Sequence, residues 1–151
     1  MNRWAMAILK ITTDQDFLRK VSKPVTDFDM RLHTLLDDMA ETMNHAGGIG
    51  IAGVQVGVLR RVCLVTDFDG VVELVNPEIV SQKRIKDGAE ACLSVPGEEI
   101  TISRPTRVKV KAQDRFGKAF EYEFRGLPAV CACHEIDHLD GVLIVDKKGD
   151  L

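Results

Sequence analysis

The sequence lacks any apolar stretch that approaches the roughly 20 residues of a membrane-spanning helix. It also lacks a basic excess, because 20 Lys and Arg residues stand against 23 Asp and Glu residues, for a net charge of −3. No internal repeat or low-complexity tract is present. These absences argue against a membrane protein, a repeat protein and a protein that binds nucleic acid directly.

Cysteine is scarce, and the four residues are Cys63, Cys92, Cys131 and Cys133. The apolar N-terminal segment is too short for a signal peptide and soon reaches Lys10. We therefore expect a cytoplasmic protein, whose reducing surroundings disfavour disulfides. The apolar neighbours of Cys63 indicate a buried core residue. Met1 and Met6 are both candidate translation starts.

Hydrophobic residues make up 45% of the 151 residues, which suits one folded domain over residues 1–151. Apolar spacing predicts an amphipathic helix over residues 27 to 46. Its apolar face comprises Phe28, Leu32, Leu35, Leu36, Met39 and Met43. We expect Thr26 or Asp27 to cap its start, and Gly47 with Gly48 to end it.

A second helix is predicted around the segment His134-Glu135-Ile136-Asp137-His138. Pro128 suits its first turn and Gly141 its end. Two histidines four residues apart lie on one helical face, where both can bind one metal ion. Glu135 then lies beside that ion and is a candidate general base.

The residues between the two helices favour strands. Residues 62 to 66 and 71 to 75 are β-branched and apolar, whereas residues 108 to 112 and 120 to 124 alternate between apolar and polar. A turn from Asp114 to Gly117 would join the last two as a hairpin. No crossover helix separates these strands. We therefore predict an α+β fold with mixed, mainly antiparallel sheets packed around the central metal-binding helix.

A catalytic metal usually has three protein ligands and one open position. After His138, the candidates for a third ligand are Asp140, Asp146 and Asp150. A better candidate lies upstream in Glu90-Ala91-Cys92-Leu93-Ser94, because a thiolate is a strong, soft ligand.

The segment from Gly48 to Gln55, with the sequence Gly-Ile-Gly-Ile-Ala-Gly-Val-Gln, is also unusual. Its glycines allow the backbone to approach a ligand closely, and the Gln55 amide can donate a hydrogen bond. A glycine-rich turn after a helix explains the same residues, so this segment alone leaves both interpretations open.

These three segments, in this order and at these separations, closely resemble the peptide deformylase family. Residues 7 to 25, the helix over residues 27 to 46, Asn76-Pro77 and Gly141-Val142-Leu143 also look like that family, and the chain ends soon after the metal helix, as in its short forms. The resemblance implies a metal-dependent hydrolase that removes the formyl group from the N-terminal formyl-methionine of newly synthesised polypeptides. Its partners would be formyl-Met peptides and nascent chains near the ribosome.

The resemblance also implies the roles of individual residues. Cys92, His134 and His138 would bind one divalent metal ion, Fe²⁺ in the cell, which Zn²⁺ or Ni²⁺ can replace. Glu135 would be the acid–base residue, while Gln55 and the backbone N–H of Leu93 would donate hydrogen bonds to the oxyanion.

Further residues carry over from the same resemblance. The substrate would contact Ile49, Gly50, Ala91, Leu127, Val130 and Cys131, of which Ile49, Leu127, Val130 and Cys131 would line the methionine pocket. Arg104, Asp137 and Cys133 would lie behind the ligands, with Asp137 paired to Arg104. Core packing of the apolar residues and a solvated charge at Asp137 are the alternative interpretations.

Three positions differ from the commonest family form: Gly53 replaces Ala, Ala91 replaces Gly, and Cys133 replaces Gln. A Cβ at Ala91 would crowd the substrate, or strain the backbone if φ is positive there. These differences leave open a low-activity deformylase-like protein that binds peptide N-termini. A zinc endopeptidase is a further alternative, and a monomer or weak homo-oligomer is expected.

Overall fold

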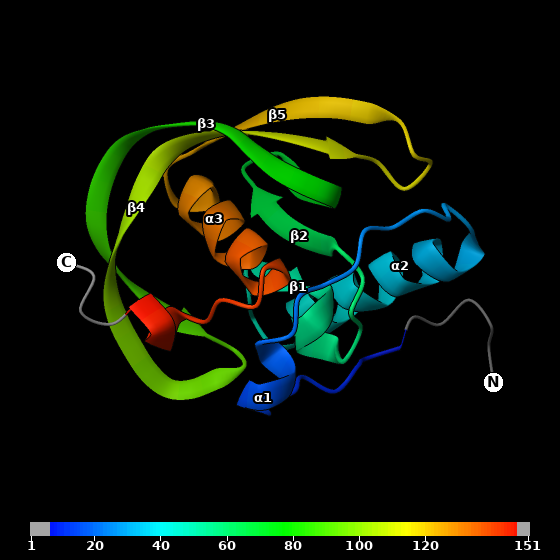
Figure 1. The fold of residues 1–151 in the computed structure, drawn as a ribbon, viewed down its shortest axis with the longest axis horizontal. Helices are drawn as coiled ribbons and strands as arrows, with labels where there is room; N and C mark the ends of the chain where they lie inside the picture. The colour runs from blue at the N-terminus through cyan, green and yellow to red at the C-terminus, as the bar shows by residue number, and fades with distance from the viewer. Residues whose placement is uncertain (1–6, 148–151) are drawn as a thin grey trace.

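A long β-hairpin that bends around a helix dominates the structure, a computed structural model that describes residues 7–147. Strands β3 (Gly70–Cys92) and β4 (Val95–Gln113) form the hairpin. Helix α3 (Leu127–Leu139) lies inside its curve (Figure 1). Met1, Met6 and Asp150, which the sequence singled out, lie outside the described residues.

The described strands form a five-stranded sheet in the order β1-β2-β3-β4-β5. The remaining strands are β1 (Gly50–Ala52), β2 (Val62–Asp67) and β5 (Ala119–Arg125). Every neighbouring pair is antiparallel. Within residues 7–147, parallel pairing is confined to an isolated bridge between Lys23 and Arg60. The prediction of an α+β fold with mainly antiparallel pairing is confirmed.

Strand β2 is buried on both faces because a helix packs on each side. Cys63 and Val65 join the core cluster that contains the apolar residues of α3. Val62 and Leu64 join a second cluster, to which α2 (Met30–His45) contributes Leu32, Leu36, Met39 and Met43. The alternation of β2 side chains between these clusters confirms Cys63 as a core residue.

The predicted amphipathic helix forms, but it begins later than expected. Its cap is Asp29 rather than Thr26 or Asp27, and the Asp29 carboxylate accepts a hydrogen bond from Leu32 N at 3.1 Å. Gly47, with φ of 71°, follows the helix in the left-handed conformation expected of a terminating glycine.

Strands β3 and β4 are much longer than the predicted segments. The pairing of β3 with β4 has irregularities between Val75 and Glu78 and between Ile79 and Ser81. Asn76 has a φ of 53° at the first of them. Such bulges bend a strand and interrupt the alternation that sequence patterns detect.

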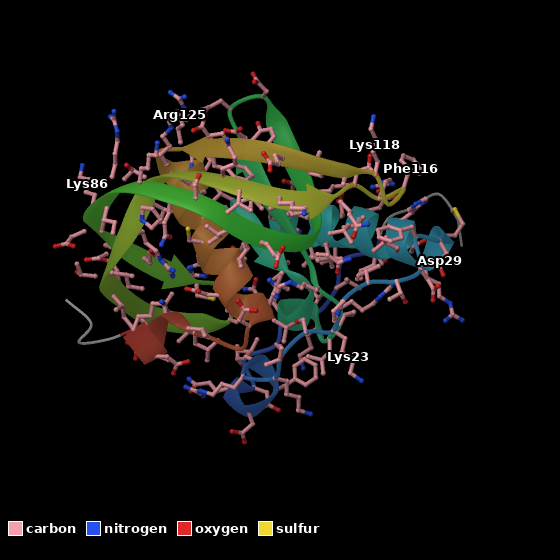
Figure 2. The ribbon with its side chains drawn as sticks, turned by 45° about the horizontal axis from the view of Figure 1, so that its top comes forward. Lys23, Asp29, Lys86, Phe116, Lys118 and Arg125 are labelled. Carbon is pink, nitrogen blue, oxygen red and sulfur yellow. The ribbon has the colours of Figure 1, made fainter. Side chains whose placement is uncertain are left out.

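The predicted turn between β4 and β5 forms at the Asp114–Gly117 segment, where Asp114 N donates to Lys118 O. Phe116 packs edge-on against His33 of α2, with the ring centroids 5.1 Å apart. Figure 2 shows Phe116 and Lys118 at the end of the molecule that also carries Asp29.

Three short helices complete the described chain: α1 (Gln15–Leu18), η1 (Gly53–Val56) and η2 (Ile144–Lys147). Among residues 7–147, no helix has the length and apolar character needed to cross a bilayer.

Candidate metal centre

Helix α3 carries two of the predicted ligands into the core. It starts after Gly126, whose φ of 67° turns the chain out of β5, and Pro128 lies in its first turn. His134 and His138 are one helical turn apart, and their ring centroids are 5.0 Å apart. Gly141, with φ of 78°, follows the last turn.

The hairpin brings Cys92 to these histidines. Cys92 is the last residue of β3 and pairs with Val95 across a two-residue turn. The candidate ligand atoms of Cys92, His134 and His138 all lie within 4.8 Å of one another, and all three residues are buried. Cys92 Sγ lies 3.2 Å from His138 Nε2.

The downstream aspartates point to other partners. The Asp140 carboxylate pairs with Arg61 at 2.7 Å. The Asp146 carboxylate accepts hydrogen bonds from Arg19 at 2.8 Å and from Leu143 N at 2.9 Å. Among the described candidates for the third ligand, Cys92 is therefore the one that lies close to both histidines.

The surroundings of the histidines fit a bound cation. Glu90 Oε1 accepts from His134 Nδ1 at 2.9 Å, which leaves Nε2 of that ring for a metal. Burial lowers the pKa of His138 to about 3, so this ring is neutral and its lone pair is available. One thiolate and two imidazoles suit a borderline divalent metal ion. The residues present therefore fit the metal that the sequence implies.

Glu90 is held in turn by a buried arginine. Arg104 donates to Glu90 through Nε at 2.8 Å and to Asp137 through Nη1 at 2.5 Å. Burial opposes the charge on Glu90, but the hydrogen bonds from His134 and Arg104 keep its pKa below the ordinary value. The Arg104–Asp137 pair expected from the sequence is thus present and connects β4 to α3.

Glu135 faces the same site from α3. Only 4% of its surface is exposed, and Oε1 has no hydrogen-bond partner among the described residues. Burial raises the pKa of Glu135 to about 7, although His134 opposes the shift. A carboxyl group with this pKa can both take and release a proton near neutral pH.

Gln55, on η1, also lies at this site. Its Oε1 accepts a hydrogen bond from Ala52 N at 2.8 Å. Its Nε2 donates to Ser94 Oγ at 3.3 Å and lies 3.6 Å from Cys92 Sγ. The amide nitrogen is therefore aimed at the metal site.

A cavity of about 380 Å³ opens beside these groups. Its lining includes Gln55, Cys92, Leu93, His134 and Glu135. It also includes all six predicted substrate contacts: Ile49, Gly50, Ala91, Leu127, Val130 and Cys131. His138, Arg104, Asp137 and Cys133 do not belong to this lining.

The structure shows how the backbone accommodates two of the departures from the family pattern, Ala91 and Gly53. Ala91 is in strand β3, and the described non-glycine residues with positive φ are Asn76 and Arg84, so Ala91 carries no backbone strain. A Cβ on Gly53 would lie 2.9 Å from Arg60 O, so glycine allows this close approach of the backbone.

Glu90 and Ser94 are two residues of the site that were not predicted from the sequence. Glu90 lies two residues before Cys92, and in a strand such residues point to the same side. The sequence therefore could have predicted that Glu90 lies near the metal ligands. Ser94 gave no such signal, because its contact with Gln55 depends on the turn between β3 and β4.

Fold and site together define a class: α+β metalloenzymes in which a bent hairpin and a central helix enclose a Cys-His-His metal site beside a buried carboxylate. The family model described as Polypeptide deformylase matches residues 7–151. A peptide deformylase from Caldicellulosiruptor bescii is 54% identical over 143 residues, which cover 94% of this chain and 86% of that protein. The chain belongs to the peptide deformylase family.

Solved structures agree with this assignment. A peptide deformylase from Legionella pneumophila has a TM-score of 0.89 and 48% identity, covering 93% of this chain and 86% of that chain. A class I type b enzyme from Acinetobacter baumannii with Met-Ala-Ser bound has a TM-score of 0.88 and 34% identity, covering 95% and 99%. The protein is thus a metal-dependent hydrolase, and its family removes N-terminal formyl groups.

Proposed function

We propose that the cavity binds the N-terminal formyl-methionine of a new polypeptide and that the surrounding side chains hydrolyse its formyl amide. The single observation that carries the proposal is the cluster of Cys92, His134 and His138 beside a cavity that is also lined by Glu135, whose Oε1 has no hydrogen-bond partner among the described residues. The Acinetobacter relative with Met-Ala-Ser bound supports a ligand that begins with methionine.

The apolar part of the cavity suits the methionine side chain. Ile49, Leu127, Val130 and Cys131 would surround it, because they line the cavity beside the metal site. The backbone of Ile49, Gly50 and Ala91 would contact the peptide backbone. Gly50 also lets β1 pack closely against α3, because a Cβ there would lie 2.4 Å from Cys131 Sγ.

Cys92, His134 and His138 would hold the metal. When bound, a divalent metal lowers the pKa of a coordinated water and so supplies a nucleophile near neutral pH. Glu135 would accept the proton of that water at Oε1, which no other described group engages. It would then return the proton to the amine of the departing peptide.

Gln55 Nε2 and the backbone N–H of Leu93 would stabilise the negative charge that develops on the formyl oxygen. Donors placed in advance around such an oxygen commonly contribute ~10²–10³-fold in rate each. Fe²⁺ is the metal we propose for the cell, and Zn²⁺ or Ni²⁺ would occupy the same ligands. Activity on chains emerging from the ribosome would place the enzyme in the cytoplasm.

The proposal is tested with protein loaded anaerobically with iron or nickel and three peptides. These are formyl-Met-Ala-Ser, its acetylated form, and a longer blocked peptide that offers internal amide bonds. We expect formate release from the first peptide and no cleavage of the other two. Cleavage of internal bonds would instead indicate an endopeptidase, and binding of all three without turnover would indicate a peptide-binding protein.

A further inference from the structure

The Gln55 side chain is fixed at both ends of its amide. Oε1 accepts from Ala52 N at 2.8 Å, and Nε2 donates to Ser94 Oγ at 3.3 Å. The contact with Ala52 determines which end is which, because the reversed amide would set two N–H donors against each other. Nε2 carries two hydrogens, so one can be held by Ser94 while the other can reach toward Cys92 Sγ, a predicted metal ligand 3.6 Å away.

Ser94 is well placed to hold the amide. It lies in the two-residue turn between the paired residues Cys92 and Val95, and only 1% of its surface is exposed. A buried hydroxyl group is almost always hydrogen-bonded, and here its contact is with Gln55. The same turn carries Leu93, whose backbone N–H is the other proposed donor to the formyl oxygen.

We propose that Ser94 is a positioning residue for Gln55: its hydroxyl oxygen accepts one amide N–H and thereby directs the other toward the formyl oxygen. This inference rests on the role proposed above for Gln55. Without Ser94, Nε2 would keep only its long contact with Cys92 Sγ among these two acceptors, so one buried N–H would have no partner and the amide would rotate about its last side-chain bond to find one. The second N–H would then point away from the charge it has to stabilise.

The first test is kinetic and uses nickel-loaded protein with a formyl-Met peptide. We expect Ser94→Ala to lower kcat by about 10- to 100-fold, because a misaligned donor retains part of the ~10²–10³-fold effect of an oxyanion donor. KM should stay within about twofold. In a Gln55→Ala background, Ser94→Ala should cost nothing further, because the residue it positions is absent.

Ser94→Thr and Ser94→Val provide a matched pair, because they have nearly the same shape and differ in whether a hydroxyl or a methyl group is present. We expect the Thr variant to be at least several-fold more active than the Val variant. Equal activity of the pair, or losses at Ser94 and Gln55 that multiply, would overturn the inference. Loss of metal from Ser94→Ala would also overturn it, because Ser94 would then support Cys92 instead.

The second test does not require turnover. In zinc-loaded protein, the side-chain amide signals of Gln55 are identified in a proton–nitrogen NMR spectrum by their absence from Gln55→Ala. Ser94→Ala should shift these signals and speed their exchange with solvent, and unchanged signals would overturn the inference. Wild-type protein that shows the amide contact but releases no formate would refute the proposed function and not the contact.

Discussion

Helix α3 and the β3–β4 hairpin meet at the metal site, but they supply their residues in different ways. The helix carries His134, Glu135 and His138 within five consecutive positions, so helical geometry alone brings them together. The hairpin carries Cys92 and Glu90, whose orientation depends on the register of β3 against β4. A shift of one residue would turn both side chains to the other face.

Because of this difference, we expect variants of the hairpin and variants of the helix to lose activity for different reasons. Hairpin variants should lose metal, because the hairpin holds the thiol ligand and the carboxylate behind His134. Variants that disturb Glu135 should keep metal and lose chemistry, because Glu135 is not a member of the ligand set.

The largest effect is expected from Cys92→Ala, which removes the hairpin's ligand. Loss of a group that only supports a ligand costs about 10–100-fold in metal affinity, so loss of the ligand itself should exceed ~10²-fold. Metal content after dialysis against a chelator measures this. Cys133→Ala is the control, since this buried thiol precedes His134 but lies outside the ligand set. A Cys92→Ala protein that retains one equivalent of metal would contradict the assignment.

Gly50→Ala should disturb side chains of helix α3 and leave the hairpin unchanged. A Cβ at this position would lie 2.6 Å from Glu135 Oε2 and 2.4 Å from Cys131 Sγ, so both side chains must move. Displacement of a catalytic group by about 1 Å can cost ~10²-fold in rate. We expect kcat to fall by about that factor with metal retained.

Gly88→Ala is the matched control, because a Cβ there would meet nothing within 4 Å. Equal kcat values for the two variants would show that the contact of Gly50 with Glu135 does not matter. The comparison requires only steady-state rates and a metal assay on both proteins.

Glu90→Gln should weaken metal binding by about 10–100-fold without removing a ligand. The variant keeps the size of the side chain but replaces the carboxylate that accepts from His134 and Arg104. Competition with a chelator of known affinity gives the change, and Glu99→Gln, on the exposed side of the hairpin, should show none. Full metal affinity in Glu90→Gln would mean that the hairpin supports the site through Cys92 alone.

The smallest effect is expected from Ala91→Gly, which exchanges one methyl group in the cavity lining. Removing the Cβ widens the space for the substrate backbone, so KM should fall several-fold while kcat stays unchanged. Glycine within a strand costs about 0.5–1 kcal/mol of stability, and the melting temperature should drop slightly. A higher KM would mean that the cavity is adapted to the alanine side chain.

The parts of the fold that follow local rules could be predicted from the sequence. Helix α2 shows its apolar spacing plainly, and α3 shows its histidines at a separation of four residues. Even there, the cap was placed too early, because Thr26, Asp27 and Asp29 are all suitable cap residues and tertiary packing selects among them.

The parts that depend on long-range pairing could not be predicted in the same way. Residues 81 to 89 of β3 are polar or exposed and show no alternation, so they form a strand only because β4 pairs with them. The same pairing places Arg104 beside Glu90 and brings Ser94 within hydrogen-bonding distance of Gln55. No spacing in the sequence indicates that these residues would be in contact. Cys92 could be predicted as a ligand because of the resemblance of the three segments to the family.

The most direct test of this account is a paired measurement of metal content and formate release for Glu135→Gln loaded with nickel. The account predicts one equivalent of metal and a kcat lowered by about 10²–10⁴-fold, the usual contribution of an acid–base residue. A variant that keeps wild-type kcat, or that loses both metal and activity, would contradict the division of roles between helix and hairpin.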